Sequence, residues 1–164
     1  MNCYLCNNSE LNDREGSVRD DPKLKIKECP NCGLVSLSSL EHIRNNHYEN
    51  SGMHGETLPS MESWLKETEH DDQRRFEMVK KLIINKRVLD FGCGAAGFVH
   101  KVQSLATEAA GVEPERRVHK YWNDSITLYN EVEDVKMSYD IITAFHVVEH
   151  LSDPRKVLRK LKSL

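Results

Sequence analysis

Apolar positions follow a helical period first and then alternate between strand and helix patterns. After Ser63 they recur at steps of three and four, which predicts a leading helix over residues 63–84, capped by Ser60 or Ser63. Short apolar runs over residues 86–92, 108–114, 125–130 and 138–148 predict strands, with amphipathic helical segments between and after them. This order of elements indicates an α/β fold with a parallel sheet of about four strands.

The N-terminal part of the chain lacks this pattern. Residues 7–28 are strongly charged and hold too few large apolar side chains to build a core, although "LKIKE" (24–28) alternates and predicts one short strand. Residues 42–62 contain Asn, Gly, His and Pro without a period, which predicts a linker. We therefore expect a small domain over 1–41, this linker, and an α/β domain over 63–164.

The amino acid composition adds only arguments against certain partners, namely nucleic acids and membranes. The chain has 164 residues, a net charge of −3 and 30% charged residues. It therefore lacks the overall positive charge that is typical of proteins that bind nucleic acids. No apolar run reaches membrane length, and the N-terminus lacks the basic start and apolar core of a signal peptide. We expect a cytoplasmic protein that does not bind membranes.

Four cysteines in the N-terminal segment form two C-x2-C pairs, Cys3 with Cys6 and Cys29 with Cys32. Each pair can place two thiolates on one ion, and two pairs complete the tetrahedron that structural Zn²⁺ prefers. Two disulfides or reactive thiols are the alternative, which a cytoplasmic chain disfavours. The spacing predicts a zinc ribbon whose metal is structural, because four thiolates leave no open position.

The stretch "VLDFGCGAAGFVHKV" (88–102) contains a glycine loop, residues 90–97, between a predicted strand and a predicted helix. Its glycines satisfy the G-x-G-x-x-G spacing of dinucleotide folds, whereas no Gly-Lys-Ser/Thr follows, which excludes a Walker loop. Asp90 argues against NAD, because a carboxylate there would repel a pyrophosphate but accept hydrogen bonds from a cationic amino acid group. Glu113, at the end of the next strand, is placed to bind a ribose diol.

Three segments together resemble a known family. "VLDFGCGAAGF", "GVEP" and "YDIITAFHVVEHLSDP" are similar to the first, second and fourth-strand motifs of class I S-adenosylmethionine-dependent methyltransferases, over residues 75–164. The resemblance implies a Rossmann-like sheet and S-adenosylmethionine as cofactor. One departure from the motif is Ala96, which stands where the family has its third glycine.

The resemblance also implies roles for single residues. Asp90 would hold the methionine end of the cofactor, Glu113 the ribose hydroxyls, and Phe145 would lie near the sulfonium. His146 is a candidate general base, although the loop that carries it can equally serve only to orient the site. The implied cofactor-binding residues are Asp90, Gly92, Gly94, Gly97, Glu113 and Phe145.

A zinc ribbon followed by this core resembles bacterial methyltransferases that act on sugar nucleotides or other polysaccharide precursors. The acidic chain also fits a small-molecule acceptor better than RNA. Two alternatives stay open: a zinc-ribbon rRNA methyltransferase, and a non-catalytic module that binds S-adenosylmethionine and docks on a partner through its ribbon. The sequence does not distinguish O-, N- and C-methylation.

Methyltransferases of this class have seven strands, and the pattern shows four before Leu164. We therefore expect a C-terminally truncated chain, or one completed by a partner. The fourth strand would expose its outer edge and favour self-association. The isolated chain is then expected to bind cofactor but to turn over poorly.

Overall fold

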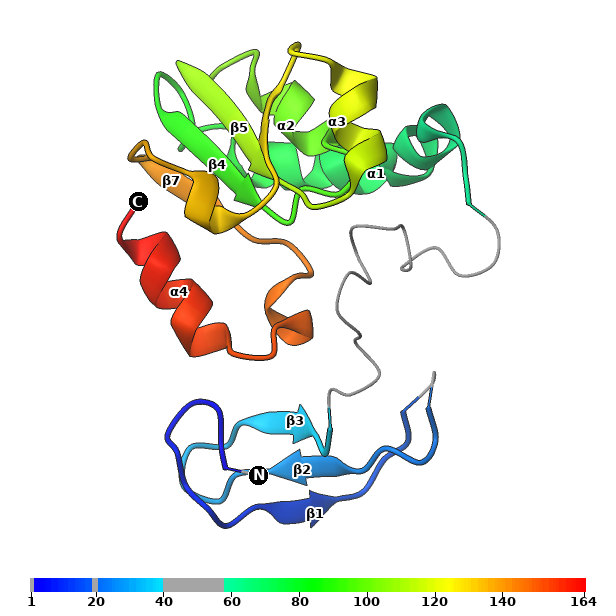
Figure 1. The fold of residues 1–164 in the computed structure, drawn as a ribbon, viewed down its shortest axis with the longest axis vertical. Coiled ribbons are helices and arrows are strands. Elements are labelled where there is room, and N and C mark those ends of the chain that lie inside the picture. Colours follow the sequence, from blue (N-terminus) through cyan, green and yellow to red (C-terminus); the bar gives the residue numbers. More distant parts are fainter. Residues whose placement is uncertain (1, 19–20, 40–57) are drawn as a thin grey trace. The chain divides into compact units, whose positions relative to one another are not determined.

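The computed structural model describes residues 2–18, 21–39 and 58–164, which form two compact units (Figure 1). One unit contains the N-terminal strands and Ser152–Leu158, and the other contains the four-stranded sheet, its helices and Arg159–Leu164. Most of the predicted linker, residues 42–57, lies outside the described residues.

The N-terminal unit is built on a three-stranded antiparallel sheet. Its strands are β1 (Asn12–Arg14), β2 (Ile26–Glu28) and β3 (Val35–Leu37), in the order β1-β2-β3. The strand predicted over 24–28 is β2, whereas the sequence did not indicate β1 and β3. Three-residue strands are too short to show a period of two.

The second unit contains the parallel sheet that the sequence predicts. It consists of β4 (Arg87–Phe91), β5 (Glu108–Val112), β6 (Thr127–Tyr129) and β7 (Ile141–Thr143), in the order β6-β5-β4-β7. All three pairings are parallel, which confirms the α/β class with four parallel strands. Among these strands β7 lies at one edge.

Four α-helices and two 3₁₀ turns complete the described elements. The helices are α1 (Met61–Val79), α2 (Gly97–Val102), α3 (Arg116–Trp122) and α4 (Pro154–Lys162). The 3₁₀ turns are Val132–Asp134 and Val148–His150.

The leading helix differs from its predicted bounds of 63–84. It begins at Met61, because the Ser60 hydroxyl caps it by accepting a hydrogen bond from the Ser63 amide at 3.1 Å. It ends at Val79, and the chain then turns through Asn85, whose φ is 56°. Apolar residues continue past Val79, so the period alone could not locate this end.

The fourth strand is much shorter than the apolar run "SYDIITAFHVV". β7 pairs with β4 only from Ile141 to Thr143, and the chain bends at Phe145 and His146. His146 has a φ of 55°, a left-handed conformation that no strand can continue through. The prediction of a long strand is therefore wrong, and its apolar second half forms a loop.

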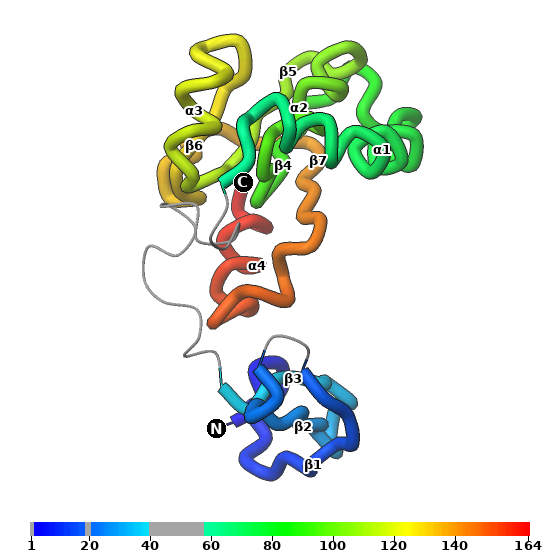
Figure 2. Tube along the Cα trace, turned by 90° about the vertical axis from the view of Figure 1, so that its right-hand side faces the viewer, coloured from blue at the N-terminus to red at the C-terminus, as the bar shows by residue number. Residues whose placement is uncertain are grey.

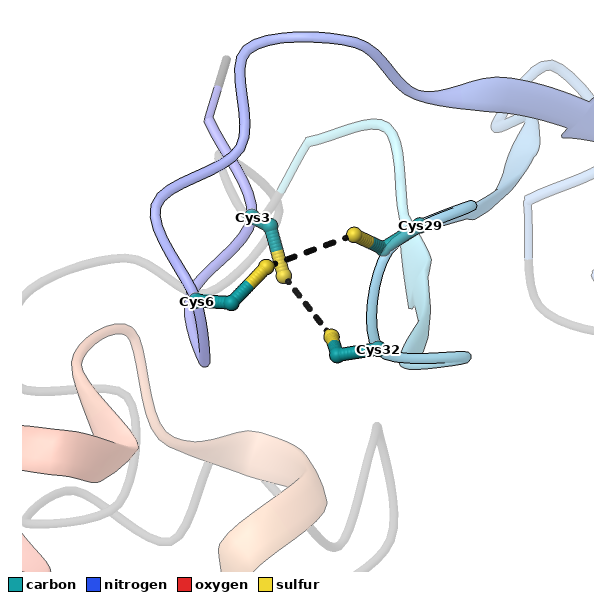
Figure 3. Close-up of side chains that lie close together, drawn as sticks. All are labelled: Cys3, Cys6, Cys29 and Cys32. Atoms are coloured by element: carbon teal, nitrogen blue, oxygen red, sulfur yellow. Dashed lines mark hydrogen bonds between the residues drawn. The ribbon is translucent and has the colours of Figure 1, made fainter.

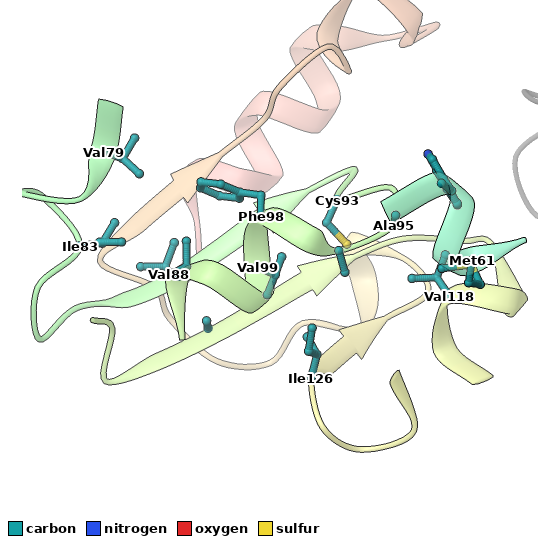
Figure 4. Packing of buried hydrophobic residues seen from close by; sticks show 14 residues of the cluster. Met61, Val79, Ile83, Val88, Cys93, Ala95, Phe98, Val99, Val118 and Ile126 are labelled. Carbon is teal, nitrogen blue, oxygen red and sulfur yellow. The ribbon is translucent and has the colours of Figure 1, made fainter. Parts of the chain in front are cut away.

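Each face of the parallel sheet buries its own core, because side chains alternate along each strand. Val88 packs in a cluster with Phe98 and Val99 of α2 (Figure 4). Ala109 belongs to the same cluster. Leu89 and Ala110, one residue further on, join a second cluster. No helix within the described residues has the length and apolar character needed to cross a bilayer.

Helix α1 packs along α2, and α2 in turn packs on β4 and β5 (Figure 2). Gly111 of β5 makes room beneath this layer. A β-carbon at this position would overlap the Sγ of Cys93 and come within 2.9 Å of Leu128 Cδ2. Cys93 is itself buried, so its side chain has little freedom to move aside.

We predict that Gly111→Ala lowers the free energy of unfolding by about 1–3 kcal/mol, because the added methyl group overpacks the core at Cys93. Urea denaturation measures this loss. Adding Cys93→Ala removes the closest atom and should restore part of the stability. Equal stability of Gly111→Ala and the unsubstituted protein would contradict the packing described.

Candidate functional site

The two predicted carboxylates lie at the carboxyl ends of neighbouring strands. Asp90 is in β4 opposite Gly111 of β5, and Glu113 follows directly after β5. Because the strands are parallel, both carboxylates lie at one edge of the sheet, where open α/β sheets bind ligands.

The glycine loop connects this edge of the sheet to α2. Gly92 and Gly94 have φ angles of 74° and 54°, in the left-handed region that favours glycine. The amides of Gly92 and Cys93 both donate to the carbonyl of Val112, which holds the loop against the end of β5. The Gly94 amide donates to Glu113 Oε2 at 2.9 Å, so the loop and Glu113 form one hydrogen-bonded unit.

Ala96 shows what the departure from the family motif means for the backbone. It has a φ of 61°, so it adopts the left-handed conformation that a glycine would take with less strain. Its side chain is fully buried in the core beneath the loop. The loop therefore keeps a glycine-like backbone at this position despite the substitution.

Asp90 is a buried acid with one side-chain partner. Only 3% of its surface is exposed, and Thr143 Oγ1 donates to its Oδ1 at 2.7 Å, because the pairing of β4 with β7 places these residues opposite one another. Burial raises the pKa of Asp90 to about 7, although the Thr143 hydrogen bond and the nearby charge of Arg75 favour ionisation. A cationic ligand at this position would stabilise the carboxylate.

Glu113 is buried in the same way but holds more hydrogen bonds. Its Oε1 accepts from the Glu115 amide at 3.0 Å, in addition to the bond from Gly94. Burial raises its pKa to about 7, against the effect of these two amide donors. Two adjacent carboxylates with such raised pKa values are typical of a functional site.

Trp64 of α1 lies beside the glycine loop. A β-carbon on Gly94 would come within 3.5 Å of its indole ring. Arg117 of α3 stacks over this ring at 5.7 Å, and its Nη1 donates to the carbonyl of Pro59 at 2.6 Å. The start of α1 is thus attached to α3 next to the loop.

Gly97 has a different role from the other loop glycines. Its φ is ordinary, and a β-carbon there would overlap Asp72 Oδ2 and approach Leu65 at 3.2 Å. The missing side chain lets α1 approach the start of α2 closely. Gly97 is therefore a packing position of the loop, and its spacing alone does not show contact with a ligand.

The sequence interpretation missed two polar residues of α1, Asp72 and Arg75. A signal was present: Asp72 falls four residues after Thr68 and four before Phe76, within the apolar face of the helix. A charged residue in that position is either paired or functional. Burial raises the pKa of Asp72, and Thr68 donates to its Oδ2 at 3.1 Å.

Phe145 packs at this site with its ring edge-on to Phe98, with centroids 5.3 Å apart. Arg75 lies over the Phe145 ring at 5.2 Å. His146 is not enclosed in the same way, because 71% of its side chain is exposed and its Nδ1 lies 3.5 Å from Glu149 Oε1. The structure thus brings Phe145 near the buried residues and leaves His146 open to solvent.

The four N-terminal cysteines converge in the other unit (Figure 3). Their sulfur atoms all lie within 4.8 Å of one another, and the pairs Cys3–Cys32 and Cys6–Cys29 are 3.5 Å apart. A tetrahedral zinc with 2.3 Å bonds would hold its sulfurs about 3.8 Å apart, so the cluster has the right size for one ion. None of the cysteines is in a disulfide.

The two cysteine pairs form turns with matching backbone hydrogen bonds. The Asn7 amide donates to the carbonyl of Cys3, and the Gly33 amide donates to the carbonyl of Cys29, each at 2.9 Å. Asn7 and Gly33 have left-handed φ angles of 63° and 72°. Glycine adopts this conformation readily at Gly33, and asparagine is among the few other residues that tolerate it, as Asn7 does.

Two asparagines connect these turns to the opposite sulfur atoms. The side-chain Nδ2 of Asn8 donates to Cys29 Sγ at 3.8 Å, while a hydrogen bond from the Asn31 side chain lowers the pKa of Cys6 to about 6. The Leu34 amide favours the thiolate of Cys32, but local desolvation and the neighbouring sulfurs raise its pKa to about 12. A bound cation would let all four cysteines ionise together.

The fold resembles that of a known enzyme. The crystal structure of magnesium protoporphyrin IX methyltransferase from Synechocystis PCC 6803 with bound SAM superposes with a TM-score of 0.51 at 14% sequence identity. The alignment covers 82% of this chain and 74% of that one, and at this identity it shows a shared fold.

No curated protein matches the chain in sequence. The family described as "Methyltransferase domain" matches residues 68–164, a range that includes the glycine loop, Glu113 and Phe145. This range is more than half of the chain, which therefore belongs to the methyltransferase domain family.

Proposed function

We propose that the protein is an S-adenosylmethionine-dependent methyltransferase that binds its donor at residues 90–97 and Glu113. The observation that carries this proposal is the pair of buried carboxylates, Asp90 and Glu113, beside a loop whose glycines expose backbone rather than side chains. A buried carboxylate with a pKa of about 7 is stabilised in its ionised form by a cationic partner, which the amino acid end of this donor supplies.

The residues present fit this donor in their chemistry. Glu113 already accepts hydrogen bonds through both oxygens and has lone pairs left for ribose hydroxyls. The backbone of Gly92 and Gly94 is partly exposed, although a β-carbon on Gly92 would overlap Val147, and Phe145 contributes an aromatic ring. When bound, S-adenosylmethionine supplies an activated methyl group on its sulfonium.

For the acceptor we propose a small molecule, such as a sugar nucleotide or another polysaccharide precursor. The net charge of −3 supports a small acceptor over RNA. His146 is available to take a proton from an acceptor, because its side chain is exposed and its Nδ1 faces Glu149. Methyl transfer to an acceptor that is already nucleophilic needs only alignment with the donor.

We also propose that Cys3, Cys6, Cys29 and Cys32 hold one structural zinc ion. The cluster's size and the matching turns support this, as does the small sheet, whose strands are too short for a stable core without such a link. With four sulfur ligands the ion would stabilise the fold and take no part in methyl transfer.

Donor binding gives the first test. S-adenosylhomocysteine should bind in calorimetric titration, and Glu113→Ala should weaken its binding by about 1–3 kcal/mol, because the ribose loses charged hydrogen bonds. Glu77→Ala changes an exposed acidic residue near the end of α1; it is the matched control and should bind as the unsubstituted protein does. Binding of NAD without any response to S-adenosylhomocysteine would reject the proposal.

The affinity for S-adenosylmethionine should also depend on pH. Asp90 and Glu113 have pKa values of about 7 in the free protein, and the donor needs both ionised. Below pH 7 the affinity should fall about tenfold per pH unit for each carboxylate that must lose its proton. Calorimetry between pH 5.5 and 8 measures this slope, and a flat profile would contradict the assignment.

The same groups should lower the stability of the free protein as pH rises. A carboxyl group with a raised pKa in the folded state stabilises the fold below its unfolded pKa, and this contribution is lost as pH rises to about 7. Asp90→Asn should therefore be more stable than the unsubstituted protein at pH 8, with a smaller difference at pH 5. Urea denaturation at the two pH values provides this control.

Metal analysis tests the cysteine cluster. Protein purified without added zinc should contain about one equivalent, and Cys29→Ser should lose it, because a tetrahedral site cannot form with three thiolates and a weak hydroxyl. Cys93→Ala is the matched control, since Cys93 lies outside the cluster. Full zinc content in Cys29→Ser, or a metal-free protein with two disulfides, would refute the zinc site.

A further inference from the structure

Helix α4 concentrates positive charge that the rest of the chain does not carry. It contains five basic residues and no acidic one, whereas the whole chain has a net charge of −3, so the other residues together carry −8. The overall charge therefore conceals a strongly basic segment. Its basic residues are Arg155, Lys156, Arg159, Lys160 and Lys162.

These five side chains lie on one side of the helix. Successive residues of an α-helix turn by about 100°, which places all five within an arc of about 160° and puts Val157, Leu158 and Leu161 on the other side. Leu161 is buried, and the carbonyl of Leu164 accepts from the Tyr139 amide at 2.8 Å. The apolar side thus attaches the end of α4 to its domain, and the five basic residues form a basic face on the opposite side.

No acidic side chain neutralises the basic face within the described residues. None of its five cations forms an ion pair there, although five arginines elsewhere do. Asp153 precedes the helix, but its Oδ1 caps it by accepting from the Lys156 amide at 3.0 Å. Arg155 and Arg159 are one turn apart, as are Lys156 and Lys160, and like charges at this spacing destabilise a helix. An anionic partner would remove this repulsion.

Two features of α4 fit a lipid surface better than RNA. Leu158 lies at the border of the basic face and is 47% exposed. A membrane surface accommodates an apolar side chain among cations, because anionic headgroups lie directly above the acyl chains. No aromatic side chain occurs between Leu151 and Leu164 to stack on unpaired bases, the usual means of sequence-specific RNA recognition.

We propose that the basic face of α4 binds the headgroups of anionic lipids, so that the protein attaches reversibly to a membrane surface. The attraction between Lys or Arg and such a surface falls off within a Debye length, so the attachment depends on salt. The expectation that the chain does not bind membranes came from the lack of a long apolar run, which bears only on spanning segments. This inference does not depend on the proposed function.

Co-sedimentation with lipid vesicles tests the inference. At about 50 mM salt the protein should sediment with vesicles of roughly three parts phosphatidylcholine to one part phosphatidylglycerol, and should stay in solution with phosphatidylcholine alone. At about 500 mM salt the binding should be lost. Arg155→Gln combined with Arg159→Gln should weaken it about twenty-five-fold, because each cation contributes about fivefold.

Lys66→Gln combined with Lys120→Gln is the matched control, because it removes the same charge from exposed positions on α1 and α3. It should bind the anionic vesicles as the unsubstituted protein does. Lys156→Gln combined with Lys162→Gln is a second variant of the basic face and should show the same loss as the arginine pair. Glutamine has a helix propensity close to that of lysine and arginine, so α4 should persist in both variants.

Three results would overturn the inference: no binding to anionic vesicles at low salt, an equal loss in the control variant, or stronger binding to a mixed-sequence RNA than to the vesicles at the same salt concentration. Urea denaturation shows which variants fold, and if the arginine pair does not, the lysine pair decides. Both variants should bind S-adenosylhomocysteine as the unsubstituted protein does. A failure of vesicle binding is therefore distinguishable from a failure of donor binding.

Discussion

Parallel pairing between β4 and β5 sets the positions of the polar groups in the candidate site. The register places Asp90 opposite Gly111, and Glu113 then emerges from β5 directly beside the glycine loop. The loop follows β4 and binds back to the end of β5 through Val112. A shift of one residue would turn Asp90 to the opposite face of the sheet, away from α1.

The sequence predicted features that depend on local residue order. The α/β class, the glycine loop and the positions of Asp90 and Glu113 at strand ends all follow from short patterns of apolar residues and glycines. It did not predict where strand pairing stops. The end of β7 depends on the left-handed backbone of His146, and a run of apolar residues hides that turn.

The sequence also did not predict which residues of distant segments contact one another. Nothing in the spacing of Arg75 indicates that it stacks on Phe145, because that contact depends on how α1 crosses α2. The same limit applies to Asn8 and its contact with Cys29, which forms only when both turns are folded. Apolar residues at a period of two in strands and 3.6 in helices identify which face of an element is buried. Which residues of two elements contact one another depends on how those elements pack.

The N-terminal hairpin between Cys6 and Cys29 can change in length without moving the four cysteines. Its ends are fixed by two turns that carry their own hydrogen bonds, so residues between β1 and β2 contribute little to the position of the sulfur atoms. The entropy of closing a loop grows only with the logarithm of its length, and doubling the connection costs about 0.6 kcal/mol. Insertions could therefore accumulate at this tip, which would let related chains change what the unit presents to solvent while its cysteine cluster stays the same.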